Sequence, residues 1–161
     1  MRKIIYSSFT LLVVAGIFSC TSEVAFPEGQ INDVTLYQKS IDTTGRVYYQ
    51  NGTILAPAGG SPHGNFKLRF NPKAASALDG TLELPTGQTF PDSSLLVKEA
   101  LDANNNLAVL AVMYKYKGSW IWAEYGPTGN TLFSFTQNGS SCIPCHSGGA
   151  NRDLVRTFDV H

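Results

Sequence analysis

Residues that bind metals or carry redox chemistry are scarce in this sequence. Its 161 residues include only three cysteines, three histidines and two methionines. A structural zinc site usually takes four protein ligands in two pairs, and the sequence has one C-x-x-C pair with no second pair and no H-x-H cluster. The inventory therefore excludes a structural zinc site as the reason for the cysteines, whereas a disulfide between the paired cysteines stays open.

Excess charge and long hydrophobic runs are lacking as well. Twelve basic residues balance twelve acidic ones, and without residues 1–19, which hold two basic residues and no acidic one, ten stand against twelve, a net charge of −2. That balance gives no support for binding to nucleic acid or to an anionic surface. Beyond the amino-terminal region no apolar stretch approaches the roughly 20 residues of a membrane-spanning helix. No internal repeat is visible, so we expect one domain.

The cysteine pair belongs to the segment Cys142-Ile143-Pro144-Cys145-His146, which has the C-x-x-C-H pattern of haem c attachment. In this pattern two thiols add to the haem vinyl groups and the adjacent histidine binds the iron from one face. We interpret Cys142 and Cys145 as covalent anchors of one haem c, and His146 as the proximal iron ligand. A thioredoxin-like dithiol fits less well, because it opens a helix early in its domain, and only 15 residues follow His146.

The amino-terminus has the features of an export signal. A basic start and an apolar run over residues 9–18 precede Ser19 and Cys20, and this run is shorter than a spanning helix. A cysteine after a small residue at the end of such a run resembles the cleavage site of bacterial lipoproteins. We therefore expect residues 1–19 to be a lipoprotein signal peptide and Cys20 to be the lipidated first residue of the mature chain, anchored by several acyl chains.

An ordinary secreted protein with an unpaired cysteine is the alternative. Both interpretations export the chain to the compartment in which bacteria attach haem c. We expect a membrane lipoprotein that faces the periplasm, and Thr21, which follows the cysteine, favours the outer membrane over the inner one.

The remaining pattern predicts a sheet. Residues 20–32 carry proline and glycine with little apolar periodicity, so we expect a tether there and one domain over residues 33–161. Residues 34–55 fit either a short helix or irregular strands, and residues 72–78 fit a short helix. Strands are predicted at Phe66–Phe70, Leu95–Leu101, Leu107–Tyr116, 120–125 and 131–135. The fold class expected is mainly β, an antiparallel meander with a few short helices and the haem motif on a short carboxy-terminal helical segment.

Motif position and sheet content narrow the class of haem protein. Small helical cytochromes c carry the motif near the amino-terminus and a methionine ligand downstream, but no methionine follows His146 here. Helix-bundle cytochromes c′ do not fit the strand pattern. Several segments instead follow one another in a recognisable order: 90–99, 113–115, 119–122, the haem motif and 152–158, with a weaker match at Asn71-Pro72. In that order they resemble the cytochrome P-460 family, which includes the sheet-built cytochromes c′-beta.

The resemblance implies a mono-haem c protein with one of two functions. One is a cytochrome that binds nitric oxide or similar small ligands, or transfers single electrons to a partner that the sequence does not identify. The other is an oxidoreductase that oxidises hydroxylamine or a related small nitrogen compound at a haem cross-linked to a lysine. Lys98 matches that lysine, and strand alternation puts it on one face with Leu96 and Ala100.

Two departures from the family favour the first function. Residues 110–113 read Leu-Ala-Val-Met and contain no acid where a distal carboxylate would align. Arg69 lies near the place of a distal arginine, but the match at Asn71-Pro72 puts Phe66 there. An apolar distal side suits the nitric-oxide-binding type, in which the iron has five ligands.

Other candidates each have a plainer alternative. Arg152 and Arg156 are candidates for contact with the haem propionates, with an ordinary surface charge as the alternative. We expect His63 to be a solvated turn residue rather than a sixth iron ligand, and Met113 to be a core residue. Six aromatic residues are candidates for the wall of the haem site, with sheet core as the alternative: Tyr114, Tyr116, Trp120, Trp122, Phe133 and Phe135.

Overall fold

The structure, a computed structural model, describes residues 31–161. The expected signal peptide over residues 1–19, the lipidation site Cys20 and all but the end of the expected tether lie outside the described residues. No helix within the described part of the chain is long and apolar enough to cross a membrane.

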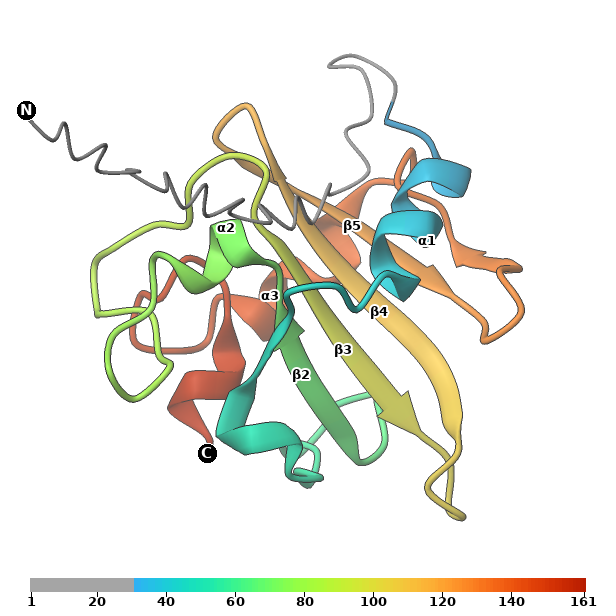
Figure 1. Cartoon of the computed structure of the whole chain (residues 1–161), viewed down its shortest axis with the longest axis horizontal. Coiled ribbons are helices and arrows are strands. Elements are labelled where there is room, and N and C mark those ends of the chain that lie inside the picture. Colours follow the sequence, from blue (N-terminus) through green and yellow to red (C-terminus); the bar gives the residue numbers. More distant parts are fainter. Residues whose placement is uncertain (1–30) are drawn as a thin grey trace, which may run out of the picture.

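Residues 31–161 form one six-stranded sheet in which each strand is antiparallel to the next one along the chain. The strands are β1 (Val47–Tyr48), β2 (Phe66–Phe70), β3 (Leu95–Leu101), β4 (Leu107–Tyr116), β5 (Ser119–Tyr125) and β6 (Thr131–Phe133). Three short α-helices accompany them in this part of the chain, namely α1 (Asp33–Ile41), α2 (Pro72–Ala75) and α3 (Ile143–His146). The predicted meander is therefore confirmed, and α3 is the short helical segment expected at the haem motif (Figure 1).

Two tight turns fix the register of the central strands. Between β3 and β4, the Asp102 carboxylate accepts hydrogen bonds from the backbone N–H groups of Asn104 and Asn106 at 2.8 and 2.9 Å. Between β4 and β5, Lys117 and Gly118 have φ angles of 49° and 76°, as a two-residue type I′ hairpin requires. Because side chains alternate between the two faces of a strand, this register decides which residues face each side of the sheet.

Both faces of the sheet are covered, and each has its own apolar cluster. Leu36 of α1 packs on one face, against a cluster that includes Leu95, Val97 and Val112. On the other face, residues such as Phe70 and Leu96 of the sheet pack against Val155 and Phe158 of the carboxy-terminal segment. In Figure 1, α1 lies in front of the sheet and the red carboxy-terminal segment lies behind it.

The segment 34–55, which the sequence left open between helix and strand, contains both. Asn32 caps α1 with a reciprocal pair of hydrogen bonds to Thr35, which is a capping box. After α1 ends, the chain forms β1 and a 3-10 helix, η1 (Tyr49–Gly52).

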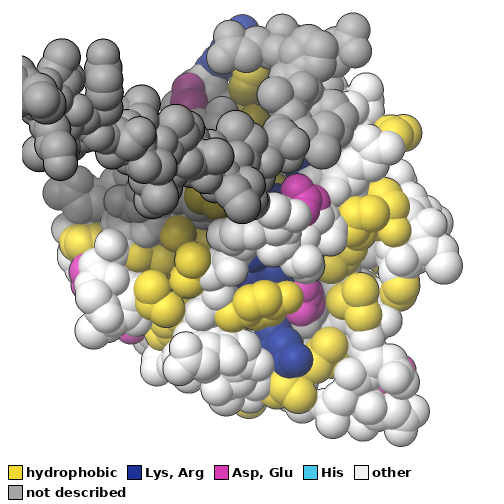
Figure 2. Space-filling view, in the orientation of Figure 1, with side chains coloured by type: hydrophobic (Ala, Val, Ile, Leu, Met, Phe, Trp, Pro, Cys, Tyr) yellow, Lys and Arg dark blue, Asp and Glu magenta, His cyan; other side chains and the backbone are white. Residues whose placement is uncertain are grey.

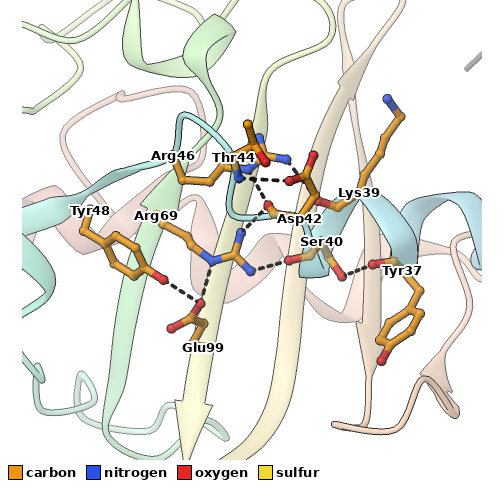
Figure 3. Close-up of polar contacts among 9 residues, drawn as sticks. All are labelled: Tyr37, Lys39, Ser40, Asp42, Thr44, Arg46, Tyr48, Arg69 and Glu99. Carbon is orange, nitrogen blue, oxygen red and sulfur yellow. Dashed lines mark hydrogen bonds and ion pairs between the residues drawn. The ribbon is translucent and has the colours of Figure 1, made fainter. Parts of the chain in front are cut away.

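A buried arginine ties the end of α1 to the sheet (Figure 3). The guanidinium of Arg69, on β2, is 2% exposed and donates to the carbonyl oxygens of Ser40 and Asp42. It also pairs with the Glu99 carboxylate at 2.5 Å, and the Tyr48 hydroxyl donates to the same carboxylate oxygen at 3.1 Å. The last carbonyls of a helix have no partner inside the helix. Arg69 supplies a partner for the Ser40 carbonyl, and the Asp42 carbonyl accepts from both Arg69 and Arg46 Nε.

Figure 2 shows the α1 side of the molecule, where hydrophobic side chains are interspersed with polar atoms and with basic and acidic side chains near the centre. No histidine is among the described side chains in view on this side. The histidines that matter below belong to the opposite side of the sheet.

The first prediction concerns the Arg69 network. Glu99→Gln removes the charge that compensates Arg69; breaking a buried pair in this way costs about 3 to 5 kcal/mol. Because the Glu99 side chain is 18% exposed, we expect a loss of about 2 to 3 kcal/mol in the free energy of unfolding, measured by urea denaturation. Lys73→Met, at an exposed position of α2, is the control and should change stability little. Equal stability of the Glu99→Gln protein and the wild type would contradict this account.

Candidate functional site

A cavity of about 340 Å³ lies between the sheet and the carboxy-terminal segment, on the face opposite α1. Its floor includes a row of cross-strand neighbours on four adjacent strands, namely Leu68, Lys98, Ala111 and Glu124. The haem motif forms part of the opposite wall. The volume falls in the range of small-molecule and cofactor sites, and the lining is mainly apolar with a few polar groups, as such sites usually are.

The haem motif enters the cavity on a helical turn that begins at residue 139. Asn138 caps the 3-10 helix η2 (Gly139–Ser141), and α3 follows at once with Pro144 in its first turn, where a proline is tolerated. The His146 N–H donates to the Cys142 carbonyl oxygen at 3.1 Å. Cys142, Cys145 and His146 all line the cavity, and both thiols are free. Burial raises the pKa of the Cys142 thiol.

The imidazole of His146 is held in one orientation and one tautomer. Its Nδ1 lies 2.8 Å from the Leu154 carbonyl oxygen. Because a carbonyl oxygen only accepts hydrogen bonds, Nδ1 carries the proton and Nε2 is left with a free lone pair. Burial, the largest influence, lowers the pKa of His146, although the bond to Leu154 acts in the opposite direction. At neutral pH the ring is therefore neutral, which is the form that ligates a metal.

The indole of Trp122 packs edge-on against the His146 ring. The two ring centroids are 4.6 Å apart at an interplanar angle of 70°. Trp122 also contacts Gly139, where a Cβ atom would lie 2.5 Å from the indole. A larger residue at 139 would push the haem motif away from β5, so glycine allows this close approach.

Lys98 lies in the cavity, on the face that strand alternation predicts. Its Nζ is 4.0 Å from the centre of the Phe66 ring, within the range of a cation–π contact. Burial lowers the pKa of this amine to about 8, and the nearby Cys145 acts weakly in the opposite direction. At pH 7 about one molecule in ten then carries the neutral amine, far more than for a solvated lysine.

His63 and Glu124 form a polar pair that the sequence analysis did not predict. The His63 side chain is 16% exposed and lines the cavity, so the expectation of a solvated turn residue is wrong. Its Nε2 is 3.8 Å from a Glu124 carboxylate oxygen, too far for a direct hydrogen bond. Burial, and then Lys98 and His146, lower the pKa of His63 to about 4, while burial raises the pKa of Glu124. Near pH 7 the histidine is neutral, so the contact is not an ion pair.

A signal for Glu124 was present in the sequence. Trp122 and Glu124 are two residues apart on β5 and therefore face the same side of the sheet. Once Trp122 is taken as part of the haem wall, the same alternation brings Glu124 to the cavity. Residues 110–113 of β4 contain no acid, and the carboxylate that lines the cavity comes from the neighbouring strand β5.

The two candidate arginines differ in position. Arg156 lines the cavity and donates from Nη1 to the Cys145 carbonyl oxygen at 3.0 Å. Arg152 does not line it, because its guanidinium pairs with Glu83 at 2.5 Å and with Asp159 at 3.5 Å. These carboxylates raise the pKa of Arg152, chiefly through the hydrogen bond to Glu83. The contact of Arg152 with a haem propionate stays a prediction.

The aromatic candidates divide between the two faces of the sheet. Trp122 and Phe133 line the cavity, together with Met113 and with Phe66, the residue aligned at the place of a distal arginine. Trp120 is on the same face but packs on Phe90. The other three belong to the α1 side: Tyr114, Tyr116 and Phe135. Arg69 also points to the α1 side, as its contacts with that helix show.

The donor set fits a haem better than a directly ligated metal ion. No group of three or more His, Cys, Asp or Glu side chains that could hold a metal ion occurs among residues 31–161. A haem brings four ligands of its own and needs one or two from the protein, and this cavity offers an imidazole with a free Nε2, two thiols and apolar walls.

No family model, curated protein or solved structure matches the chain.

The second prediction concerns the Lys98 amine. In protein produced without haem, with lysines labelled by reductive ¹³C-methylation, we expect the Lys98 signal to titrate near pH 8, because burial favours the neutral amine. The same protein unfolded in urea is the control, because its lysines are then solvated and titrate near the ordinary value of about 10.4. Lys98→Met identifies the signal by removing it. A Lys98 signal that titrates at the same pH in the folded and the unfolded protein would contradict the burial of this amine.

Proposed function

We propose that this protein is an exported mono-haem c-type cytochrome that binds nitric oxide or a similar small ligand, transfers single electrons, or does both. The observation that carries the proposal is the His146 ring, which belongs to a C-x-x-C-H motif, donates through Nδ1 to Leu154 and leaves Nε2 free beside an apolar cavity. A histidine that serves as a metal ligand usually makes such a hydrogen bond through its other ring nitrogen.

The residues that would hold the haem all line the cavity. Cys142 and Cys145 would form the thioethers, His146 would ligate the iron, and Trp122 packs edge-on against the His146 ring. Arg156 supplies a guanidinium at the cavity that suits a haem propionate. When bound, the haem supplies reversible one-electron chemistry and a coordination position for a small ligand.

A single protein ligand to the iron is supported by the surroundings of the two other candidates. Met113 is 8% exposed and packs within the sheet cluster, directly across from Leu96 and Trp122. His63 lies against Glu124. Neither side chain is held by a hydrogen bond that would aim it at an iron, whereas His146 is.

The third prediction is the coordination state. Protein matured with the haem c machinery should give mainly high-spin optical spectra in both oxidation states and should bind nitric oxide readily. His63→Ala and Met113→Leu should leave these spectra unchanged, while His146→Ala should disturb the iron without removing the thioethers. Low-spin spectra in both states that either of the first two substitutions abolishes would instead indicate a six-coordinate electron carrier.

Oxidation of hydroxylamine or a related small nitrogen compound is a second candidate function. It is favoured by three polar groups in the cavity: the Lys98 amine with its lowered pKa, and the pair of His63 and Glu124. In the family that the sequence resembles, a lysine at the place of Lys98 is joined covalently to the haem edge. A lysine amine can form such a bond only when it is neutral and held in contact, and Lys98 meets the first condition in part.

The fourth prediction separates the two functions. If Lys98 is cross-linked, proteolysis should release a haem peptide that contains Lys98 together with Cys142 and Cys145, and the ferrous Soret band should lie far to the red. Lys98→Met should restore an ordinary haem c spectrum, whereas Lys117→Met, at a solvent-exposed turn, should not. If Lys98→Met leaves both the spectrum and nitric oxide binding unchanged, the hydroxylamine-oxidising function loses its main support.

The fifth prediction concerns export and anchoring. We propose that the chain is a bacterial lipoprotein anchored through Cys20 and facing the periplasm, in the outer membrane rather than the inner one. The wild type should partition into detergent and fractionate with outer membranes, and Cys20→Ala should abolish lipidation as judged by mass spectrometry. A soluble wild-type protein with a different mature amino-terminus would rule this anchor out.

A further inference from the structure

The turn that follows the haem motif has an unusual backbone. Asn151, Asp153 and Leu154 have φ angles of 57°, 51° and 66°, in the left-handed region that residues other than glycine seldom adopt. For a leucine this conformation costs about 1 to 2 kcal/mol. A backbone held in this way needs surrounding contacts that over-determine it.

Those contacts converge on Asp153. Its two carboxylate oxygens accept hydrogen bonds from Lys115 Nζ at 2.8 and 2.9 Å, and one of them also accepts from the Phe90 N–H at 2.8 Å. The backbone carbonyl of Asp153 accepts from Trp120 Nε1 at 2.8 Å. Lys115 and Trp120 belong to neighbouring strands of the sheet, directly opposite each other in register, so both side chain and backbone of Asp153 are tied to the sheet.

This ion pair is buried on both sides. Lys115 is 5% exposed and the Asp153 side chain is 9% exposed. A buried ion pair contributes little net stability, because desolvation of the two charges offsets their attraction, yet breaking it is costly. What the pair provides here is a fixed position for the turn.

The fixed turn also places the residue that follows Asp153. The Leu154 carbonyl, immediately after Asp153, is the oxygen that accepts the hydrogen bond from His146 Nδ1 at 2.8 Å. A continuous set of contacts therefore runs from β4 and β5 through Asp153 to the His146 imidazole.

We infer that Asp153, held by Lys115 and Trp120, is a positioning residue that keeps His146 in its Nδ1–H tautomer and presents Nε2 to the cavity. This inference rests on the proposed function in that Nε2 then serves as the iron ligand. A bond from Nδ1–H to a carbonyl raises the basicity of Nε2, which favours the ferric state over the ferrous one. Weakening the contacts that hold Asp153 should therefore raise the reduction potential of the haem iron.

The test uses four variants of the full chain. Asp153→Asn removes the charge that Lys115 compensates. Trp120→Phe removes the Nε1–H donor and reduces the indole to a smaller aromatic ring beside Phe90. Lys115→Arg keeps the positive charge. Glu99→Gln breaks an ion pair on the α1 face and is the matched control for lost stability alone.

Three measurements are made on each folded variant. In the haem-loaded protein, Asp153→Asn and Trp120→Phe should shift the preference for the ferric state by about tenfold, which is about 59 mV for one electron, and should weaken the iron–histidine stretch in resonance Raman spectra. In protein without haem, ¹⁵N NMR should show His146 changing from a single Nδ1–H tautomer to a mixture. Lys115→Arg and Glu99→Gln should stay close to the wild type in all three.

Failure of the proposed function and failure of this inference give different results. A wild type that takes up no haem would contradict the proposed function, and the ¹⁵N measurement would still decide the role of Asp153. An unchanged His146 tautomer and an unchanged reduction potential in folded Asp153→Asn and Trp120→Phe would overturn the inference. Equal changes in Glu99→Gln would overturn it too, since the contacts of Asp153 would then act only on overall stability.

Discussion

The site depends on one packing constraint, which is that the carboxy-terminal segment must lie flat against the face of the sheet opposite α1. Val155 and Phe158 insert into the apolar cluster of that face, and the ion pair between Lys115 and Asp153 fixes the turn that precedes them. With the segment in place, the haem motif faces β2 to β5 across the cavity. Without it the sheet would expose an apolar face, and His146 would lose the carbonyl that orients its ring.

The cavity combines apolar walls with four groups whose charged forms burial disfavours. His63 and His146 are neutral near pH 7, the Lys98 amine is neutral in a minor fraction, and the pKa of the Glu124 carboxyl is raised. A planar apolar cofactor that displaced water from this space would strengthen every remaining electrostatic interaction. The protonation of Lys98, His63 and Glu124 then bears directly on the choice between binding a neutral diatomic ligand and moving protons from a substrate.

Local signals in the sequence predicted most of the fold. The bounds of β2, β3 and β4 agree with the expected strands, because each is an apolar or alternating run between turn residues, and the turns at 102–106 and 117–118 are encoded by the Asp and Gly residues that such turns need. The helical turn at the haem motif agrees with the short helical segment expected there. Only the division of residues 34–55 was left open, since its helix is stabilised partly by distant contacts such as that of Arg69.

The site was less predictable where it depends on contacts between distant parts of the chain. Arg152 pairs with Glu83, which is 69 residues away, and nothing near Arg152 in the sequence indicates that partner. His63 was assigned to a solvated turn from its Pro and Gly neighbours, but the loop folds over the cavity and buries the ring. Lys98 was assigned to the correct face because strand alternation is a local property.

The central claim is that Cys142 and Cys145 hold one haem covalently in this cavity. The most direct measurement is the intact mass of the denatured, acid-extracted protein after expression with the haem c machinery, for the wild type and for the Cys142→Ala/Cys145→Ala double variant. The account predicts that the wild type keeps the added mass of one haem and that the double variant carries none. A folded wild-type protein whose mass is that of the polypeptide alone, with all haem extracted, would contradict it.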